Sequence, residues 1–513
     1  MSDATAMSHR ADVRADANLL SRLDRAPVTM TLKVGLGVLI LVWLIESFDI
    51  GVVSTLLLVL KPAWHLDATQ VGLLGASGTI GLVVGIVPAG RLADTLGRKT
   101  VMLFGTTVFA VFTALGAVAP NFWILFVLRL LAGLGEGAIF PVPYMMISEL
   151  VGKKLRGRVM GYAQWVLNAG YTLPALAGLW ATTSFSPQWS WRVPLLIGGF
   201  PLLLLPALQR WVPESPRFLL KRAELRTRPE DRDTVRDLVE RIEDEAHLPH
   251  DRKLLDPALL DVLSVTATRD VGVRTLFSSP YLRRSVIAYA ALTSSFVIWY
   301  TMLTYAPTIF KTLLHASSHT SLLYTAIMMF ISAFGVFYQG RWGDRWGRKK
   351  VFASYIFLAA IGMVILPFYD ALGTGPTIVA GVLIAWFGLG SFSLSKLYMA
   401  EQYPTRLRGL GTATGEMTSR ALTGGVLVFF LPTLFSSWGV KNVFIAAAAV
   451  MILLMLPMLL AGTETAGRNM EELGTNTTGA VAPQADLPRD VASIPTARRE
   501  RTVTTRARFE EMG

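Results

Sequence analysis

A series of long apolar runs constrains the fold of this chain more than any other sequence feature. Each run holds roughly 20 residues, enough for a helix to cross a hydrocarbon core about 30 Å thick. Because an unpaired backbone amide in lipid costs several kcal/mol, the runs are predicted to be helices. Twelve runs are expected, near residues 34–60, 70–92, 100–119, 122–147, 159–182, 191–212, 285–310, 320–340, 351–370, 376–400, 409–433 and 440–462.

The composition excludes most other classes of protein. Of the 513 residues, 52% are hydrophobic and 16% are charged, against about 25% charged residues in a soluble domain. A soluble enzyme, a nucleic-acid binder and a disordered chain are therefore not expected, despite the net charge of +12. The absence of cysteine removes thiolate metal sites and cysteine nucleophiles. With no phosphate-binding loop either, we predict no metal and no cofactor, with a proton as the only coupling ion.

The basic residues predict the orientation of the chain. They concentrate in the loops on one side of the bundle, while the opposite loops offer little beyond Lys61, Lys311 and Lys441. The basic side is expected to face the cytoplasm, and an even number of spans places both termini there. We expect a multi-pass protein of a plasma membrane, specifically a bacterial inner membrane. The basic side holds Arg91, Arg98, Lys99, Lys153, Lys154, Arg156, Arg158, Arg345, Arg348, Lys349, Lys350, Arg406 and Arg408.

Three motifs recur at an offset of about 250 residues. GRLADTLGRK begins at Gly90, and GRWGDRWGRK begins at Gly340. Glu149 followed by LRG at residues 155–157 returns as Glu401 followed by LRG at 407–409, and PES at 213–215 resembles TET at 463–465. The repeats predict two six-helix halves with a substrate site between them near the middle of the membrane.

The expected domain order follows from these repeats. Residues 1–33 form an N-terminal cytoplasmic tail, 34–212 the first half, 213–284 a cytoplasmic linker, 285–463 the second half, and 464–513 a basic C-terminal tail. Highly charged stretches of the linker, such as residues 230–245, are typical of short surface helices. The linker is either a latch that braces the halves or a solvated connection.

The repeated motifs resemble the major facilitator superfamily over about residues 34–470, and several features resemble its sugar-porter-like branch. These are FDIGV at 48–52, Arg129, PESPR at 213–217 and EQYPTRLRG at 401–409. The paired glutamines and the tryptophan with which true sugar porters hold sugar are absent. Glu136 and Arg420 instead look like the nicotinate-permease and synaptic-vesicle-protein-like group, whose bacterial members include proton-coupled importers of small organic acids. The resemblance implies an all-α membrane protein of twelve helices in two pseudo-symmetric halves, working as a monomer.

Charged residues inside the apolar runs are candidates for proton coupling, because a charge at mid-bilayer costs roughly 2.5–3.5 kcal/mol. Glu46 and Asp49 lie three residues apart and share one helical face. Asp49 is the expected proton carrier, and the resemblance implies Arg129 as its partner. Glu46 and Glu136 are further candidates. The alternative is a static ion pair that only fixes packing.

The second half offers candidates for binding an anion. An offset of 252 maps Gln164 onto Glu416 and Asn168 onto Arg420, so two related helices each carry a polar pair. Lys396 adds a positive charge, and arginine presents a planar fork that matches a carboxylate. Alternatively, Arg420 only pairs with Glu416, and Lys396 extends to a membrane interface. Trp165, Trp299 and Tyr300 are the aromatic candidates for holding a flat ring.

A charge network is expected at the cytoplasmic helix ends, where it would close the inner gate without touching substrate. Its predicted members, in two repeat-related sets, are Asp94, Arg98, Glu149 and Arg156, and Asp344, Arg348, Glu401 and Arg408.

The sequence thus predicts a secondary transporter, not an enzyme, that imports a small organic anion such as nicotinate or a benzoate with a proton. One proton carried with one monoanion moves no net charge, so stronger accumulation would need a second proton on Glu46, Glu136 or Glu416. Alternatives are a proton-linked sugar or polyol importer, drug or metabolite efflux, and a transporter-like receptor.

Overall fold

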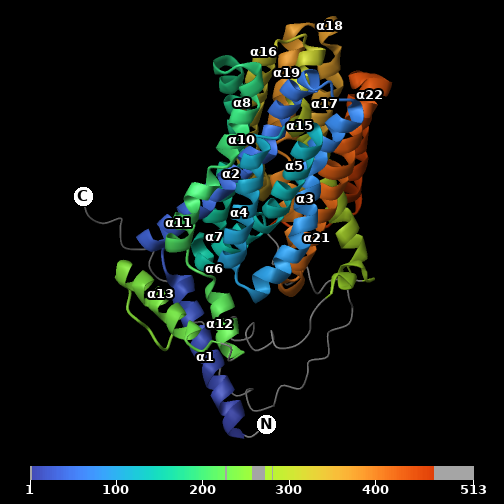
Figure 1. The fold of residues 1–513 in the computed structure, drawn as a ribbon. Helices are drawn as coiled ribbons and strands as arrows, with labels where there is room; N and C mark the ends of the chain where they lie inside the picture. Colours follow the sequence, from blue (N-terminus) through green and yellow to red (C-terminus); the bar gives the residue numbers. More distant parts are fainter. Residues whose placement is uncertain (1–2, 226–227, 257–271, 280, 467–513) are drawn as a thin grey trace, which may run out of the picture.

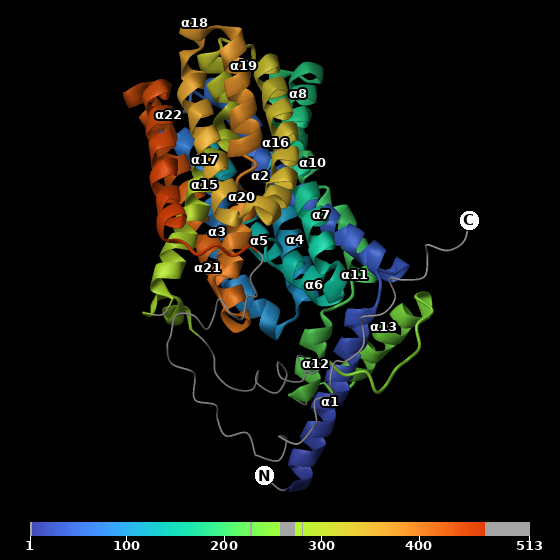
Figure 2. The ribbon, with the colours of Figure 1, turned by 180° about the vertical axis from the view of Figure 1, so that it is seen from behind.

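The computed structural model describes residues 3–225, 228–256, 272–279 and 281–466. Every regular element in these ranges is helical, and the long helices run side by side as one bundle (Figure 1). One end of the bundle carries the basic loops and the helices α1, α12 and α13; we call it the basic end (Figures 1 and 2). The other is called the opposite end.

The first half contains the predicted spans, but several are broken into shorter helices. Prolines at the breaks explain this, because proline lacks the N–H that continues a helix. Pro141 separates α5 from α6, and Pro201 begins α11. The helices are α2 (Met30–Ala63), α3 (Ala68–Thr95), α4 (Arg98–Gly116), α5 (Phe122–Ile139), α6 (Val142–Leu150), α7 (Lys153–Gly170), α8 (Leu173–Ser184), α9 (Pro187–Ser190), α10 (Arg192–Gly198) and α11 (Pro201–Trp211).

The second half follows the same plan and includes two wide π-helical turns, η3 and η4. The second of them begins directly after Arg420. The elements are α15 (Leu282–Leu313), α16 (Ser318–Trp346), α17 (Arg348–Ile365), η2 (Leu366–Phe368), α18 (Tyr369–Leu372), α19 (Thr374–Leu383), η3 (Ile384–Gly388), α20 (Phe392–Glu401), α21 (Thr405–Arg420), η4 (Ala421–Leu427) and α22 (Val428–Ala461).

The helices agree with the predicted crossings. Ten helical segments of the described residues are long and apolar enough to span a membrane. One of them, Leu407–Ala461, has 55 residues and turns back at Gly439, whose φ is 77°. At 1.5 Å per residue it measures about 80 Å, enough for two crossings. The predicted fifth span is divided between α7 and α8, neither of which spans alone.

The two halves pack tightly against each other from the opposite end to the middle of the bundle. Gly72 of α3 lies directly against the carbonyl of Phe429, where any side chain would collide with backbone. One turn further along, Gly75 faces Tyr305 and Val428, and near the middle Thr79 touches Gly424. Glycines on α3 therefore let the halves close tightly at this end.

The polar segment at residues 1–33 contains a helix to which the sequence analysis assigned no structure. This helix, α1 (Asp3–Arg25), packs against α12 (Pro216–Glu224), α13 (Asp231–Glu245) and the first half. A short 3₁₀ helix, η1 (Val273–Phe277), packs instead on the second half. The helix α13 lies where the sequence analysis expected a short helix in the linker. A latch between the two halves stays a prediction.

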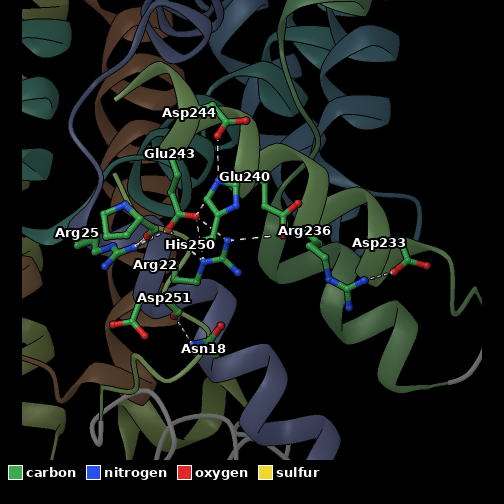
Figure 3. A network of polar contacts seen from close by, with 11 residues as sticks. Asn18, Arg22, Arg25, Asp233, Arg236, Glu240, Glu243, Asp244, His250 and Asp251 are labelled. Carbon is green, nitrogen blue, oxygen red and sulfur yellow. Dashed lines mark hydrogen bonds and ion pairs between the residues drawn. The ribbon is translucent and has the colours of Figure 1, made fainter. Parts of the chain in front are cut away.

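Buried ion pairs join α1 to α13 (Figure 3). Glu243 accepts hydrogen bonds from Arg22 at 2.5 Å and from Arg25 at 2.8 Å, and Arg22 and Glu243 are both buried. Burial alone would raise the pKa of Glu243, but the two arginines outweigh it and hold that pKa below its usual value. Asp24 of the same helix pairs with Arg156 of α7 at 3.1 Å, so α1 is attached to the first half.

Candidate functional site

An ion pair between α2 and α5 lies in the interior of the first half. Arg129 donates through Nη1 to both carboxylate oxygens of Asp49, at 2.7 and 2.6 Å, and through Nη2 to the Asp49 carbonyl at 3.3 Å. Asp49 is 0% exposed and Arg129 is 1% exposed. The pairing predicted from the sequence is therefore present, and its role in proton coupling stays a prediction.

The two other acidic candidates of the first half are also buried. Glu136 follows Arg129 by two turns on α5 and interacts electrostatically with Asp49 and Arg129. Glu46, one turn before Asp49 on α2, is 0% exposed. Both carboxylate oxygens of Glu46 lack a hydrogen-bond partner among the described residues.

A triad of charged side chains occupies the facing part of the second half. Glu416 forms an ion pair with Lys396 of α20 at 2.5 Å and another with Arg420, one turn further along α21, at 3.0 Å. Arg420 also donates through Nη1 to the Tyr300 hydroxyl at 2.9 Å. Two cations thus share one carboxylate, and the triad keeps one positive charge in excess.

Aromatic rings surround this triad. The Arg420 guanidinium carbon lies 4.0 Å from the centroid of Phe140, which belongs to the first half, and 5.5 Å from that of Phe296. The Lys396 ammonium lies 5.2 Å from the Phe140 ring. Cation–π contacts hold a charge more firmly when it is shielded from water, so the excess charge is fixed in place between the halves.

Trp299 and Tyr300 extend the aromatic wall on α15. Their rings lie 4.8 Å apart, edge to face, and Trp299 meets Tyr171 of the first half at 5.1 Å. Trp165 is half-buried, and its ring contact is with Tyr162 at 6.0 Å. The structure therefore brings two of the three predicted aromatic residues, Trp299 and Tyr300, into contact. Trp165 packs against Tyr162 instead.

The neutral polar pair on α7, Gln164 and Asn168, is buried. The Asn168 side-chain amide donates to the backbone carbonyl of Gln164 at 2.8 Å. The Gln164 side chain accepts a hydrogen bond from the Tyr144 hydroxyl, while its Nε2 has no partner among the described residues. A donor in this position is suited to an oxygen of a ligand.

Two repeat-related charge networks occupy the basic end, one in each half. In the first half, Arg98 contacts Asp94 at 3.2 Å and Glu149 at 3.9 Å. In the second, Arg348 contacts Asp344 and, at 3.2 Å, Glu401. Both arginines follow a glycine with φ near 100°, Gly97 and Gly347, where an L residue would be strained.

The third and weakest repeat motif completes each network. Glu214 accepts from the backbone N–H of Arg98 at 3.0 Å, and Glu464 accepts from that of Arg348 at 2.8 Å. These glutamates therefore neutralise the positive N-termini of α4 and α17.

Two predicted gate residues behave differently. Arg156 pairs with Asp24 of α1 in place of a carboxylate of the network. Arg408 is near enough to Glu401 for electrostatic interaction, but its Nε has no hydrogen-bond partner among the described residues. The ion pairs that the structure shows within the networks stay inside one half, so closure of a gate between the halves stays a prediction.

Sequence reasoning missed Phe140 and Tyr144, which complete the site from the first half. Tyr144 packs on Trp43 with ring centroids 4.3 Å apart. The signal was available, since Glu136, Phe140 and Tyr144 recur every four residues, the spacing of one helical face.

Together, a bundle of two repeated halves and a buried charged site at their interface define a membrane transport protein of the major facilitator fold. The chain belongs to the family described as "Sugar (and other) transporter", whose model matches residues 37–476. This is a family of transporters, not of enzymes.

Individual relatives match most of the chain. It is 27% identical to the niacin transporter of Acinetobacter baylyi, over 89% of this chain and 100% of that protein. It is also 27% identical to the gentisate transporter of Corynebacterium glutamicum, over 81% of this chain and 84% of that protein. Among solved structures, the Escherichia coli xylose transporter superposes with a TM-score of 0.67 at 18% identity, covering 84% of this chain and 99% of that one. This last likeness shows the fold.

Proposed function

We propose that this protein imports a small organic anion, an aromatic carboxylate such as nicotinate or a benzoate, together with a proton. The observation that carries the proposal is the excess positive charge of the Lys396–Glu416–Arg420 triad, buried among aromatic rings. A flat anion satisfies both features, because its carboxylate meets the cations and its ring meets the aromatics. Relatives that carry niacin and gentisate support this substrate class.

Arg420 and Lys396 are the proposed partners of the substrate carboxylate. The guanidinium presents a fork that accepts a carboxylate bidentately, and Lys396 adds a point charge. Phe140 and Trp299 offer faces and edges to the ring, while Gln164 and Asn168 face the substrate from the first half. Because these residues come from both halves, bound substrate would draw the halves together.

Asp49 is the proposed proton carrier. Ionised, it is neutralised by Arg129 at 2.6 Å; protonated, it loses that charge pair, and α2 and α5 are free to shift. The halves then rock about the site, and the networks at the basic end would exchange partners as the gate closes. We further propose that the basic end is cytoplasmic, in a bacterial inner membrane, and that one copy suffices.

The test is uptake into proteoliposomes with the lumen alkaline. Labelled nicotinate, benzoate, a short dicarboxylate and a hexose are offered to the wild type, to Asp49→Asn and to Asp370→Asn, whose carboxylate is 81% exposed. We expect gradient-driven uptake of an aromatic acid that is lost in Asp49→Asn and kept in Asp370→Asn. Acid uptake indifferent to pH and to Asp49 would contradict the proposal.

A proton-linked sugar or polyol importer is the second candidate. The description of the family and the fold of the xylose transporter favour it. Uptake of the hexose in the same assay, with no uptake of the acids, would establish it instead.

A further inference from the structure

Glu46 is an acidic group of the site whose surroundings the proposed single-proton cycle leaves unexplained. It is 0% exposed, and neither carboxylate oxygen has a hydrogen-bond partner among the described residues. An ionised carboxylate in such a place, without a partner, is far too costly to persist. Glu46 must therefore be neutral, or must reach a cation when it ionises.

The cations within its electrostatic reach are those proposed to hold the substrate. Arg420 and Lys396 attract the Glu46 carboxylate, and Glu416 and Asp49 repel it. Glu136 of α5 and the hydroxyls of Tyr144 and Tyr171 also interact with it. Arg129 of α5 is occupied by Asp49, and Tyr300 of α15 by Arg420.

A count of charges shows what this arrangement can do. The Asp49–Arg129 pair is neutral, and the Lys396–Glu416–Arg420 triad carries +1. While Asp49 is ionised, either an ionised Glu46 or the carboxylate of a substrate balances that charge, but both together leave these groups with −1. Binding of an anion is therefore favoured by a proton on Glu46, and the two carboxylates compete for the same cations.

We propose that Glu46 takes up a second proton in each cycle, when the substrate carboxylate replaces the Glu46 carboxylate as the partner of Arg420 and Lys396. Transport is then electrogenic. A proton from external water forms an O–H bond on Glu46 as the anion binds, and it returns to water on the other side as the anion leaves. This inference rests on the proposed function. Two protons with one monoanion carry one net positive charge inward.

The test uses wild-type proteoliposomes without a pH gradient, labelled nicotinate, and a potassium diffusion potential set by valinomycin. With one net charge per cycle, accumulation rises tenfold for about 59 mV of inside-negative potential. Glu46→Gln, which cannot ionise, should lose this response and still accumulate nicotinate in a pH gradient. Glu240→Gln, the same change on α13 outside the bundle, should respond as the wild type does.

Two further readouts separate the outcomes. A pH dye in the lumen of wild-type vesicles gives the ratio of protons to nicotinate, expected to be two, even if Glu46→Gln fails to fold.

Wild-type uptake that follows the pH gradient but does not respond to the potential would overturn the second proton and leave the proposed function standing. Loss of the potential response in Glu136→Gln, with the response kept in Glu46→Gln, would assign the proton to Glu136. Absence of acid uptake under any gradient would overturn the proposed function itself.

Discussion

Replacing Arg420 by lysine isolates the fork that we assign to the substrate carboxylate. The substitution keeps the positive charge, so Glu416 retains two cationic neighbours and the buried charge balance is unchanged. It removes the planar guanidinium, its hydrogen bond to Tyr300 and its stacking at 4.0 Å on Phe140. An Arg-to-Lys change at a bidentate, stacked site is not conservative.

The expected magnitude follows from the interactions lost. A hydrogen bond to a charged group is worth about 1.5–3 kcal/mol. Loss of one such bond to the carboxylate therefore weakens nicotinate binding by about 10- to 150-fold. Nicotinamide has the same ring without the charge, so it has no charged hydrogen bond to lose in the Arg420→Lys variant. Its binding should weaken only through the lost stacking of Arg420 on Phe140, worth about 0.5–1 kcal/mol or about 2- to 5-fold.

The assay is competition by nicotinate and by nicotinamide against labelled substrate in proteoliposomes. The matched control is Arg192→Lys, because Arg192 lies 4.3 Å over the Trp191 ring but belongs to the short helix α10, away from the triad. The control should leave both inhibition constants unchanged. Equal weakening of the acid and the amide in Arg420→Lys would refute a direct bond between Arg420 and the carboxylate.

Three further predictions concern the parts around the site. Gly97→Ala places a side chain at φ 100° against Glu214 and should cost about 1–3 kcal/mol in thermal unfolding, whereas Gly90→Ala, with open space, should change stability little. Because the pKa of Glu243 is lowered, its contribution to the docking of α1 is present above the ordinary carboxylate pKa of about 4.3 and is lost as the pH falls through the folded value. Fluorophores on α1 and α13 should therefore stay close at pH 5–7 and separate only below about pH 4; separation near pH 6 would contradict this ion-pair account. Deletion of residues 467–513 should leave nicotinate uptake unchanged, and loss of a cellular response with intact uptake would favour the receptor alternative.

Most of the fold was predictable because lipid leaves the backbone few choices. Length and hydropathy locate the crossings, and the repeated motifs that begin at Gly90 and Gly340 divide them into halves. The breaks were less predictable. Pro141 and Pro201 interrupt helices inside apolar runs. The mean hydropathy of a run does not reveal such a break, because a single proline changes the mean very little.

The helix α1 escaped prediction for a different reason. Its sequence is polar, and it is held in place by partners more than 200 residues away, through the pairing of Arg22 with Glu243. No local pattern reports a contact of that kind. Such a helix becomes visible only when the tertiary structure brings the two charges together.

The site itself was partly predictable. The cost of a charge inside an apolar run identified Asp49, and helical spacing paired Glu416 with Arg420. Arg129 was assigned as the partner of Asp49 through the resemblance to the family. The sharing of Glu416 between Lys396 and Arg420, and the isolation of Glu46, depend on how α2, α20 and α21 meet. Helical periodicity within one element carries no information about the element that faces it.

The measurement that tests the central claim most directly is proton movement driven by the substrate alone. Nicotinate is added outside proteoliposomes with equal pH on both sides, no membrane potential, and a pH dye in the lumen. The account predicts that the lumen acidifies as nicotinate enters with its proton, that addition of nicotinamide produces no such signal, and that Asp49→Asn is silent. Entry of labelled nicotinate with no change in lumenal pH would contradict coupling between proton and anion.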